Sequence, residues 1–418
     1  MWQPPQFDLG PAKNIWEIRK MKKILTAAVC ATALLAAPQA MAAKAKKIKI
    51  GFVTTLSGGP GVIGKDMRQS VQIALDHLGS KMAGVPVEVI FEDDQVKPEV
   101  GKQKTEKLLN KDKVDFVSGF IWSHVVLASR NPVVKAGKFL IISNAGTSKI
   151  AGRLCHENIF STAWQNDQVP MALGEVLNKR GVKSLYIVAP NYAAGRDMVA
   201  GVERTFKGKV LGKDLTKWPT QLDFSAELAK ARAAKPDGVF IFYPGRATNA
   251  FFRQYAQAGM TKTPLYSVFS VDSLSLPKLQ QAKLQNVLGT FNTQFWSPDL
   301  ETPVNRKFVA DYRKKFNAYP SHYGAQSYDS IMMIADAVKA VNGDLSKMDA
   351  MRAQMRKAEY PSVRGKFTYG NNHFPIQDFY LREVVKDADG NWTTKIVQKV
   401  YENHQDVYAN KCKMKKTW

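Results

Sequence analysis

The stretch KIKIGFVTTLSGGPGVIGKDMRQSVQIALDHL, residues Lys47–Leu78, joins a strand, a glycine-rich loop and a helix. Lys47–Leu56 is rich in apolar and β-branched residues, which is typical of a buried strand. Asp66–Leu78 repeats apolar residues at helical spacing, which predicts a helix with one buried face. A strand followed directly by a helix is the unit from which parallel sheets covered on both faces are built.

Strands and helices continue to alternate beyond this stretch, in two successive series. The first series predicts strands at Val85–Phe91, Val114–Phe120, Phe139–Ser143 and Ile159–Thr162, with helices at Glu99–Leu109 and Val125–Ala136. The second series predicts strands at Leu185–Ala189, Val239–Tyr243, Leu265–Phe269 and Leu288–Trp296, with helices at Arg196–Phe206, Phe224–Ala234 and Asn249–Ala258. This pattern predicts an α/β protein with two doubly wound parallel-sheet lobes.

The last part of the chain has a different pattern. A longer helical region at 303–355 follows the second series, which argues against a single barrel. Lys366–Tyr369, Asp378–Val385 and Thr393–Val400 then predict C-terminal β-strands, separated by Asn-Asn and Asp-Gly pairs that favour tight turns.

The loop Gly59–Gly64 matches the G-x-G-x-x-G pattern of dinucleotide-binding proteins, because it follows a strand and opens a helix. The acidic residues of that pattern lie about 20 positions further on, whereas Glu92–Asp94 lie about 30 positions beyond the loop. An exported dinucleotide-dependent enzyme is therefore a remote alternative, and a turn that merely tolerates glycine is another. We favour a loop whose backbone N–H groups and Ser57 hydroxyl meet a smaller polar ligand at a helix N-terminus.

The composition excludes several classes of protein. The chain has 418 residues with 45% hydrophobic content, enough for two or three globular domains. Three cysteines and six histidines exclude a disulfide-dense scaffold and a dense metal cluster, so no metal is expected. The 60 Lys and Arg residues outnumber the 36 Asp and Glu residues, giving a net charge of +24. These cations are spread along the chain without a nucleic-acid-binding motif, so anionic solutes and membrane surfaces are the expected partners and nucleic acid is not.

Residues 21–42 have the composition of a secretory signal peptide. A short basic start precedes the apolar run Ile24–Ala37, and an A-x-A cleavage site follows at Ala40 and Ala42. The run of about 14 residues is shorter than the roughly 20 that a membrane-spanning helix needs. Residues 1–20 share none of these features, and we interpret them as an N-terminal extension or a misassigned start.

Two cysteines, Cys155 and Cys412, remain once the signal peptide is removed. An even pair in an oxidising compartment suggests one disulfide, which would tie the C-terminal tail to the first lobe. Two free buried thiols are the alternative.

Short stretches spread along the mature chain match the motifs of one known family. They are Ile48–Gly58, Asp93-Asp94, Phe116–Gly119, Asn144–Thr147, Ala189–Gly195, Leu222–Ser225, Trp296–Asp299 and Tyr323–Asp329. In this order they resemble the leucine/isoleucine/valine-binding type of periplasmic substrate-binding protein, which supplies ABC importers. The resemblance covers nearly the whole mature chain.

The resemblance implies the type I periplasmic binding fold, in which three crossovers join two lobes. The crossovers would lie near Thr162-Ala163, Thr293 and residues 371–376. Lobe 1 would comprise 43–162 plus 294–372, lobe 2 would comprise 163–293 plus 373–401, and a basic tail would follow at 402–418. The implied partners are a small-molecule carboxylate and an inner-membrane permease and ATPase complex. We expect a periplasmic monomer without a cofactor.

The resemblance also implies a ligand site between the lobes. Ser123, with Asn144, Ala145 and Thr147, falls where the family holds the carboxylate of an amino acid. Tyr192 matches the tyrosine that covers the ligand from the second lobe. Asp272 lies near, but offset from, the acidic residue that pairs with the ligand ammonium, and Ile63 stands where an aromatic residue is common.

Aromatic and basic residues surround the same loops. Trp122 and His124 flank Ser123, Trp164 follows the first crossover, and Tyr243 and Arg246 end a strand of the second lobe. Flat aromatic walls favour a ring-shaped ligand, and Arg246 would hold a carboxylate with its fork of N–H donors. We therefore expect an aromatic carboxylate, as in the branch of the family that takes up coumarate-like acids, with a branched-chain or other hydrophobic amino acid as the alternative.

Catalysis is not expected. The sequence has no nucleophile elbow, P-loop or H-E-x-x-H motif. The adjacent Asp93 and Asp94 would point to opposite faces of a strand and make a poor acid–base pair. A ligand-sensing receptor domain is a rival class, but it would need a membrane helix or a fused signalling module. We expect hinge closure of the two lobes around the ligand.

Overall fold

The computed structural model describes residues 1–6 and 47–416 of the chain. The expected signal peptide at 21–42 and its cleavage site lie outside the described residues, as does most of the expected N-terminal extension. The chain divides into two units, Met1–Ala43 and Lys44–Trp418, and the second unit holds every described helix and strand.

Lobe 1 is built on a six-stranded sheet with the strand order β2-β3-β1-β4-β5-β6. Its strands are β1 (Ile48–Thr54), β2 (Lys81–Met82), β3 (Val85–Asp93), β4 (Phe116–Gly119), β5 (Phe139–Ile142) and β6 (Ile159–Ser161). All pairs are parallel except β2 with β3. Because β1 lies between β3 and β4, the chain reverses its winding there, and the loops after β1 and β4 border the crevice where ligands of such sheets bind.

Lobe 2 is built on an eight-stranded sheet with the order β12-β13-β11-β10-β9-β7-β8, and β14 pairs with β13. Its strands are β7 (Ser184–Pro190), β8 (Lys209–Thr216), β9 (Gly238–Ile241), β10 (Leu265–Val268), β11 (Phe291–Gln294), β12 (Thr368–Tyr369), β13 (Pro375–Lys386) and β14 (Trp392–His404). The winding reverses at β7, which lies between β8 and β9. The loops after β7 and β9 therefore border the crevice from the second lobe.

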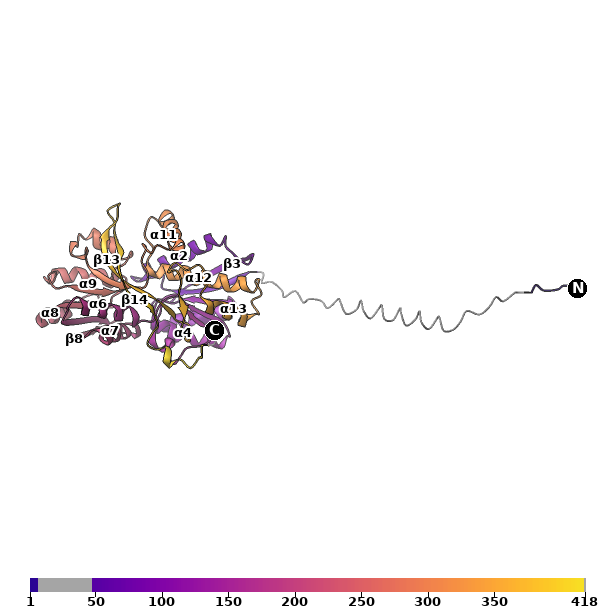
Figure 1. Ribbon diagram of the computed structural model, residues 1–418, viewed down its shortest axis with the longest axis horizontal. Coiled ribbons are helices and arrows are strands. Elements are labelled where there is room, and N and C mark those ends of the chain that lie inside the picture. The colour runs from indigo at the N-terminus through magenta and orange to yellow at the C-terminus, as the bar shows by residue number, and fades with distance from the viewer. Residues whose placement is uncertain (7–46, 417–418) are drawn as a thin grey trace. The chain divides into compact units, whose positions relative to one another are not determined.

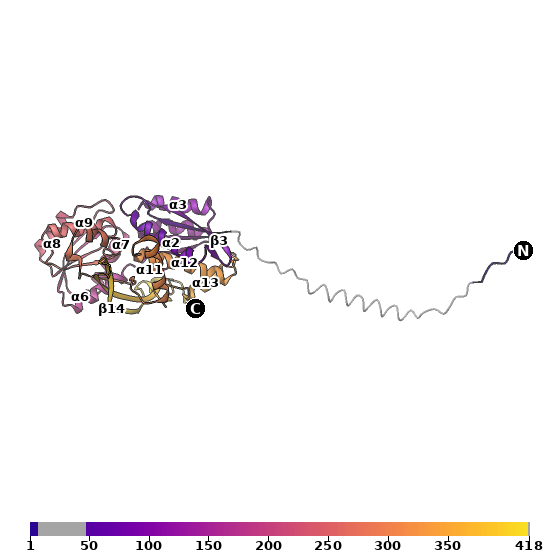
Figure 2. The same ribbon diagram turned by 90° about the horizontal axis from the view of Figure 1, so that it is seen from above.

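Helices cover both sheets (Figures 1 and 2). They are α2 (Gly61–His77), α3 (Pro98–Asn110), α4 (Ser123–Lys135), α5 (Ser148–Ala151), α6 (Gln168–Lys179), α7 (Ala193–Thr205), α8 (Ser225–Ala234), α9 (Arg246–Gln257), α10 (Leu276–Gln281), α11 (Pro303–Phe316), α12 (His322–Ala340) and α13 (Met348–Lys357), with short 3-10 turns at Gln285–Val287 and Ala409–Lys411. Both views place α8 and α9 with lobe 2, and α2 and α13 with lobe 1. The predicted two-lobed α/β class is confirmed.

The chain passes between the lobes three times. It leaves lobe 1 after β6 and enters lobe 2 with α6, returns after β11 to form α11–α13, and leaves again to add β12, β13 and β14 to the lobe 2 sheet. Helix α12, from the late segment, packs against α2 from the beginning of the chain. Each lobe is therefore assembled from segments that are far apart in the sequence.

A buried arginine joins two of these crossovers. The Arg364 guanidinium donates to the carbonyl oxygen of Thr162, to that of Ala163 (3.1 Å) and to Gln377 Oε1 (2.8 Å). It also pairs with Asp329 of α12 at 3.2 Å, and both side chains are almost fully buried. Arg364 thus holds the first crossover, the strand that follows the third crossover, and the long helix of lobe 1 in one arrangement.

A disulfide links Cys155 of lobe 1 to Cys412, with their Cα atoms 5.8 Å apart. The residues after β14 thereby return to lobe 1. Asn371 donates to the carbonyl oxygens of Ala409 (3.0 Å) and Met414 (2.9 Å), which fixes the same segment beside the third crossover.

Some elements differ from the sequence predictions. Strand β8 and helix α6 were not predicted, and the strand predicted at 288–296 is shorter because a 3-10 turn precedes β11. Strand β8 has exposed positions along its length, so it lacks the apolar signal of a buried strand. Strand β14 extends to His404, so the first residues of the expected tail belong to the sheet.

Candidate functional site

Two helices begin at the crevice without a side-chain cap. Helix α4 starts after the N-cap residue Trp122, and helix α7 starts after the N-cap residue Tyr192. Neither indole nor phenol accepts a hydrogen bond from the helix there, and neither first turn contains an acidic residue. The first N–H groups of a helix have no partner within it and carry partial positive charge, so both ends favour an anion.

Both N-cap residues line one enclosed cavity between the lobes. Its lining consists of Ile121, Trp122, Ser123, Asn144, Trp164, Asn166, Tyr192, Ala194, Met198, Phe242, Pro244, Phe269 and Tyr323. None of these side chains is acidic or basic. We call this space the inner cavity; its volume of about 20 Å³ holds about one water molecule.

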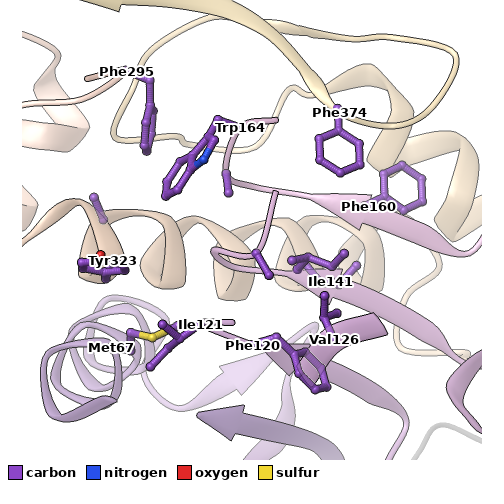
Figure 3. Packing of buried hydrophobic residues seen from close by; sticks show 14 of the residues in the cluster. Met67, Phe120, Ile121, Val126, Ile141, Phe160, Trp164, Phe295, Tyr323 and Phe374 are labelled. Carbon is purple, nitrogen blue, oxygen red and sulfur yellow. The ribbon is translucent and has the colours of Figure 1, made fainter. Parts of the chain in front are cut away.

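Aromatic rings form much of the wall. Trp164 stacks on Phe269 with ring centroids 4.5 Å apart, and lies 5.2 Å from Phe295 behind it. Figure 3 shows Trp164 beside Phe295, and Tyr323 at one end of a helix that passes below them. On the other side, Trp122 meets Tyr192 edge-on at 6.3 Å. A flat ring fits such walls better than a branched aliphatic chain does.

The polar groups of the inner cavity are held by hydrogen bonds. Ser123 Oγ accepts from Asn166 Nδ2 (3.1 Å), which leaves the hydroxyl proton free to donate. Asn144 donates to the carbonyl oxygen of Ile121 (2.7 Å) and accepts from Gln326 Nε2 (2.6 Å). Trp164 differs, because its buried indole N–H has no partner among the described residues.

Burial shifts the ionisable side chains at and beside the inner cavity toward their neutral forms. Burial raises the pKa of the Tyr192 and Tyr323 hydroxyls, so both stay protonated. Burial also raises the pKa of Asp197, although it accepts hydrogen bonds from Asn166 and Ser148. With no lining carboxylate, the two helix N-termini are the main source of charge, and their sign favours an anionic ligand.

The model of the family described as periplasmic binding protein matches residues 47–391. The chain belongs to the periplasmic binding protein family. Members of this family bind substrates, and the family implies a periplasmic location.

This periplasmic binding protein is similar to several known proteins. It is 27% identical over 387 residues to the "Leu/Ile/Val-binding protein homolog 6" of Brucella abortus, covering 90% of this chain and 97% of the relative. A solute-binding protein of an R. palustris ABC transporter, in complex with benzoate, is 28% identical with a TM-score of 0.81, covering 88% of this chain and 100% of that one. Another, from Rhodopseudomonas palustris BisB5 with 3,4-dihydroxybenzoic acid, is 26% identical with a TM-score of 0.80, covering 87% and 99%.

The structure brings five of the residues proposed from the sequence together at the inner cavity. They are Trp122, Ser123, Asn144, Trp164 and Tyr192. All five follow the carboxyl end of a strand by a few residues, where the topology places ligand loops.

Ala145 and Thr147 follow Asn144 but do not line the cavity. Both are buried, and the Thr147 hydroxyl accepts from the Lys149 N–H as the cap of α5 (3.4 Å). Ile63 is also buried, and it faces the other lobe, because a Cβ added at Gly245 would lie 3.6 Å from Ile63 Cδ1. These residues shape the cleft without touching the cavity.

Tyr243 and Arg246 lie away from the inner cavity. Tyr243 packs on Phe224 within lobe 2 (4.8 Å), and its hydroxyl lies 2.7 Å from that of Thr216. Arg246 is exposed at the first turn of α9, where its stem approaches Gly59: a Cβ added there would lie 3.1 Å from Arg246 Cδ. The cavity therefore has no arginine fork.

The side chains of Asp272, Ser57 and His124 do not line the inner cavity, and each contacts other groups of the protein. Asp272 Oδ1 accepts from the N–H groups of Leu274 (2.9 Å) and Ser275 (3.1 Å), and burial raises the pKa of Asp272 to about 7. Ser57 is exposed and hydrogen bonds to Asp93. His124 Nε2 lies 3.0 Å from the carbonyl oxygen of Val96, and burial lowers the pKa of the ring.

Sequence reasoning missed several lining residues, among them Asn166, Phe269 and Tyr323. Phe269 ends a predicted strand, so the carboxyl-end rule points to it. Tyr323 comes from the first turn of α12, whose position depends on the second crossover. Tyr323 is, however, the first residue of the family-like stretch Tyr323–Asp329, and that resemblance is a signal that could have pointed to it.

The described residues offer no metal site. Within residues 1–6 and 47–416, no group of three or more His, Cys, Asp or Glu side chains is placed to hold a metal ion. None of the helices in these ranges is long and apolar enough to cross a membrane.

Proposed function

We propose that this periplasmic binding protein is the solute-binding component of an ABC importer and binds a small aromatic carboxylate. The observation that carries the proposal is the convergence of two uncapped helix N-termini, one from each lobe, on a cavity lined by aromatic rings and free of charged side chains. The carboxylate would accept hydrogen bonds at these N-termini and from Ser123, and the ring would lie against Trp164 and Phe269.

The relatives support the same ligand class. Two of them, each more than 25% identical, were crystallised with benzoate and with 3,4-dihydroxybenzoic acid. The hydroxyl of a hydroxylated ring would have a ready partner in the Trp164 indole N–H, which has no other acceptor among the described residues.

A branched-chain or other hydrophobic amino acid is the second candidate, because a curated relative is named a Leu/Ile/Val-binding protein homolog. Its ammonium group would need a carboxylate or several carbonyl oxygens. No acidic side chain lines the inner cavity, and Asp272 is engaged by backbone N–H groups. The cavity therefore favours the aromatic acid.

Binding would require the lobes to part and close again. The inner cavity of about 20 Å³ is far below the roughly 300 Å³ at which ligand pockets begin. Since the lining comes from both lobes and from the first crossover, only the closed arrangement gives the ligand all its contacts. One chain supplies the whole site, so we propose that it acts as a monomer and, without an acid–base pair in the cavity, performs no catalysis.

The remaining parts of the proposal concern the cell. We propose that the signal peptide at 21–42 is cleaved near Ala42 and that the mature protein delivers its ligand to an inner-membrane permease and ATPase complex.

Isothermal titration of the mature protein with p-coumarate, benzoate and leucine tests the proposal. We expect binding of at least one aromatic acid and little or no response to leucine. Ser123→Ala should weaken aromatic-acid binding about tenfold, because a hydrogen bond to a charged group is lost. Ser225→Ala is the matched control, since Ser225 also begins a helix but is exposed and lies outside the cavity. Tight leucine binding without a response to either acid would contradict the proposal.

A further inference from the structure

A larger groove lies on the surface next to the inner cavity. It has a volume of about 480 Å³ and is lined by Val96, Lys97, Pro98, His124, Leu127, Lys149, Asn191, Tyr192, Ala193, Arg196, Trp218 and Pro219. The residues up to Lys149 belong to lobe 1, and those from Asn191 on belong to lobe 2. We call this space the mouth groove. It is large enough for a small organic molecule.

The mouth groove is cationic. Lys97, Lys149 and Arg196 are all exposed, and none of the lining residues is acidic. Among the described residues none of the three has a carboxylate within ion-pair distance; Arg196 Nη1 donates only to Asn191 Oδ1, at 2.8 Å. Elsewhere many surface cations of this protein are paired, as Lys104 and Lys107 are with Glu92.

These cations come from different lobes. Lys97 and Lys149 belong to lobe 1, and Arg196 belongs to α7 of lobe 2. Closing the lobes therefore brings like charges into one groove, which opposes closure at low ionic strength. An anion between them would convert this repulsion into attraction to both lobes.

The base of the mouth groove is aromatic. Tyr192 stacks on Trp218 at 5.3 Å with an interplanar angle of 16°, and His124 meets Tyr192 edge-on at 5.3 Å. Trp218 Nε1 and His124 Nδ1 are buried and have no hydrogen-bond partner among the described residues. Tyr192 also lines the inner cavity, so one layer of rings separates the two spaces.

We propose that the mouth groove is a second binding site, for a carboxylate-like or phosphate-like anion held by Lys97 and Lys149 of one lobe and Arg196 of the other. The anion has two possible sources. It is either a second acidic group on the ligand whose ring occupies the inner cavity, or a separate anion from solution. In both cases its binding and lobe closure favour each other. The site goes beyond the proposed function, because its charges attract an anion whatever the inner cavity binds.

The test uses the mature protein at low ionic strength and the double variant Lys149→Gln/Arg196→Gln. The matched control is Lys135→Gln/Lys262→Gln, which also removes one exposed cation from each lobe but lies outside the groove. Isothermal titration is carried out with inorganic phosphate alone, with benzoate in the presence and absence of phosphate, and with 1,4-benzenedicarboxylate.

A separate anion as the source predicts that phosphate binds and tightens benzoate binding about fivefold. A second acidic group on the ligand predicts that the dicarboxylate binds about fivefold more tightly than benzoate. Either gain should disappear in the groove variant and persist in the control. The proposal is overturned if neither gain in affinity is seen. It is also overturned if both variants lose the gain equally, because the gain would then come from the net charge of the protein and not from the mouth groove. Absence of benzoate binding would count against the proposed function, while the phosphate titration would still test the groove.

Discussion

Replacing Arg364 with methionine should destabilise the protein by about 3–5 kcal/mol, the usual loss when one partner of a buried ion pair is removed. The side chains of Arg364 and Asp329 are 3% and 0% exposed, so water cannot replace the lost charge. In the variant Asp329 keeps hydrogen bonds from the Ser362 hydroxyl (2.6 Å) and the Val363 N–H (3.0 Å) only. The carbonyl oxygen of Thr162 also loses the Arg364 guanidinium as a donor.

Equilibrium unfolding in urea measures this loss. Burial already raises the pKa of Asp329, and Arg364 opposes that rise. Without Arg364 the folded-state pKa of Asp329 rises further, so the penalty is present above that pKa and shrinks as acidification protonates the carboxyl group. The matched control is Arg313→Met, whose 41% exposed guanidinium pairs with exposed Asp389 and should contribute at most about 1 kcal/mol. A loss below about 1 kcal/mol for Arg364→Met, or one independent of pH, would refute the reasoning.

Three further predictions concern the disulfide, a buried carboxyl group and the ligand. Reducing the Cys155–Cys412 bond, which spans 257 residues, should lower the free energy of unfolding by up to about 5 kcal/mol, while the double serine variant should not respond to reductant in the same unfolding assay. Burial raises the pKa of Asp272 from 3.8 to about 7, so the folded state holds a proton that the unfolded chain releases, and stability should fall as pH rises through this window. Between pH 4 and pH 8 this loss in the free energy of unfolding is on the order of 4 kcal/mol, and Asp272→Asn should abolish it in urea unfolding experiments across that range. An unchanged pH dependence in the variant contradicts the assignment. Trp164→Phe should lower the affinity for hydroxybenzoates about fivefold in calorimetry and change the affinity for benzoate by no more than about twofold. An equal loss for both ligands would mean that the indole supplies only contact area and no hydrogen bond.

Much of the fold could be predicted from the sequence because buried parallel strands are apolar throughout. The strand of Lys47–Leu56 and its counterparts in lobe 2 show this pattern, and so does the alternation with amphipathic helices. Strand β8 shows neither signal, because it lies at the edge of its sheet with much of its length exposed. Helix α6 begins shortly after the first crossover and was missed although its sequence carries a helical signal: the apolar residues Val169, Ala172, Leu173, Val176 and Leu177 recur at helical spacing.

The candidate site could be predicted only in part. Trp122 and Ser123 follow a strand in the crevice, so topology alone points to them. Arg246 also follows a strand, and its guanidinium suggested a carboxylate contact in the ligand site. The chain turns at Gly245 with φ 67°, however, and the Arg246 side chain lies against Gly59 instead. Tyr323 lies in the first turn of α12, a late segment that packs against α2 of lobe 1, so its place in the cavity depends on a contact between segments far apart in the sequence.

The interleaving of the two lobes also bears on how the protein reaches its compartment. The lobe 1 core includes α12, and the lobe 2 sheet gains β13 and β14 only after residue 374. A chain still being synthesised therefore cannot complete either sheet-and-helix unit until almost all of it is available, since the early segments lack the surfaces that bury their apolar faces. Such a chain stays open for longer than one with contiguous domains would. If the proposed signal peptide directs this chain through a membrane channel before it folds, late completion would keep the polypeptide competent for passage.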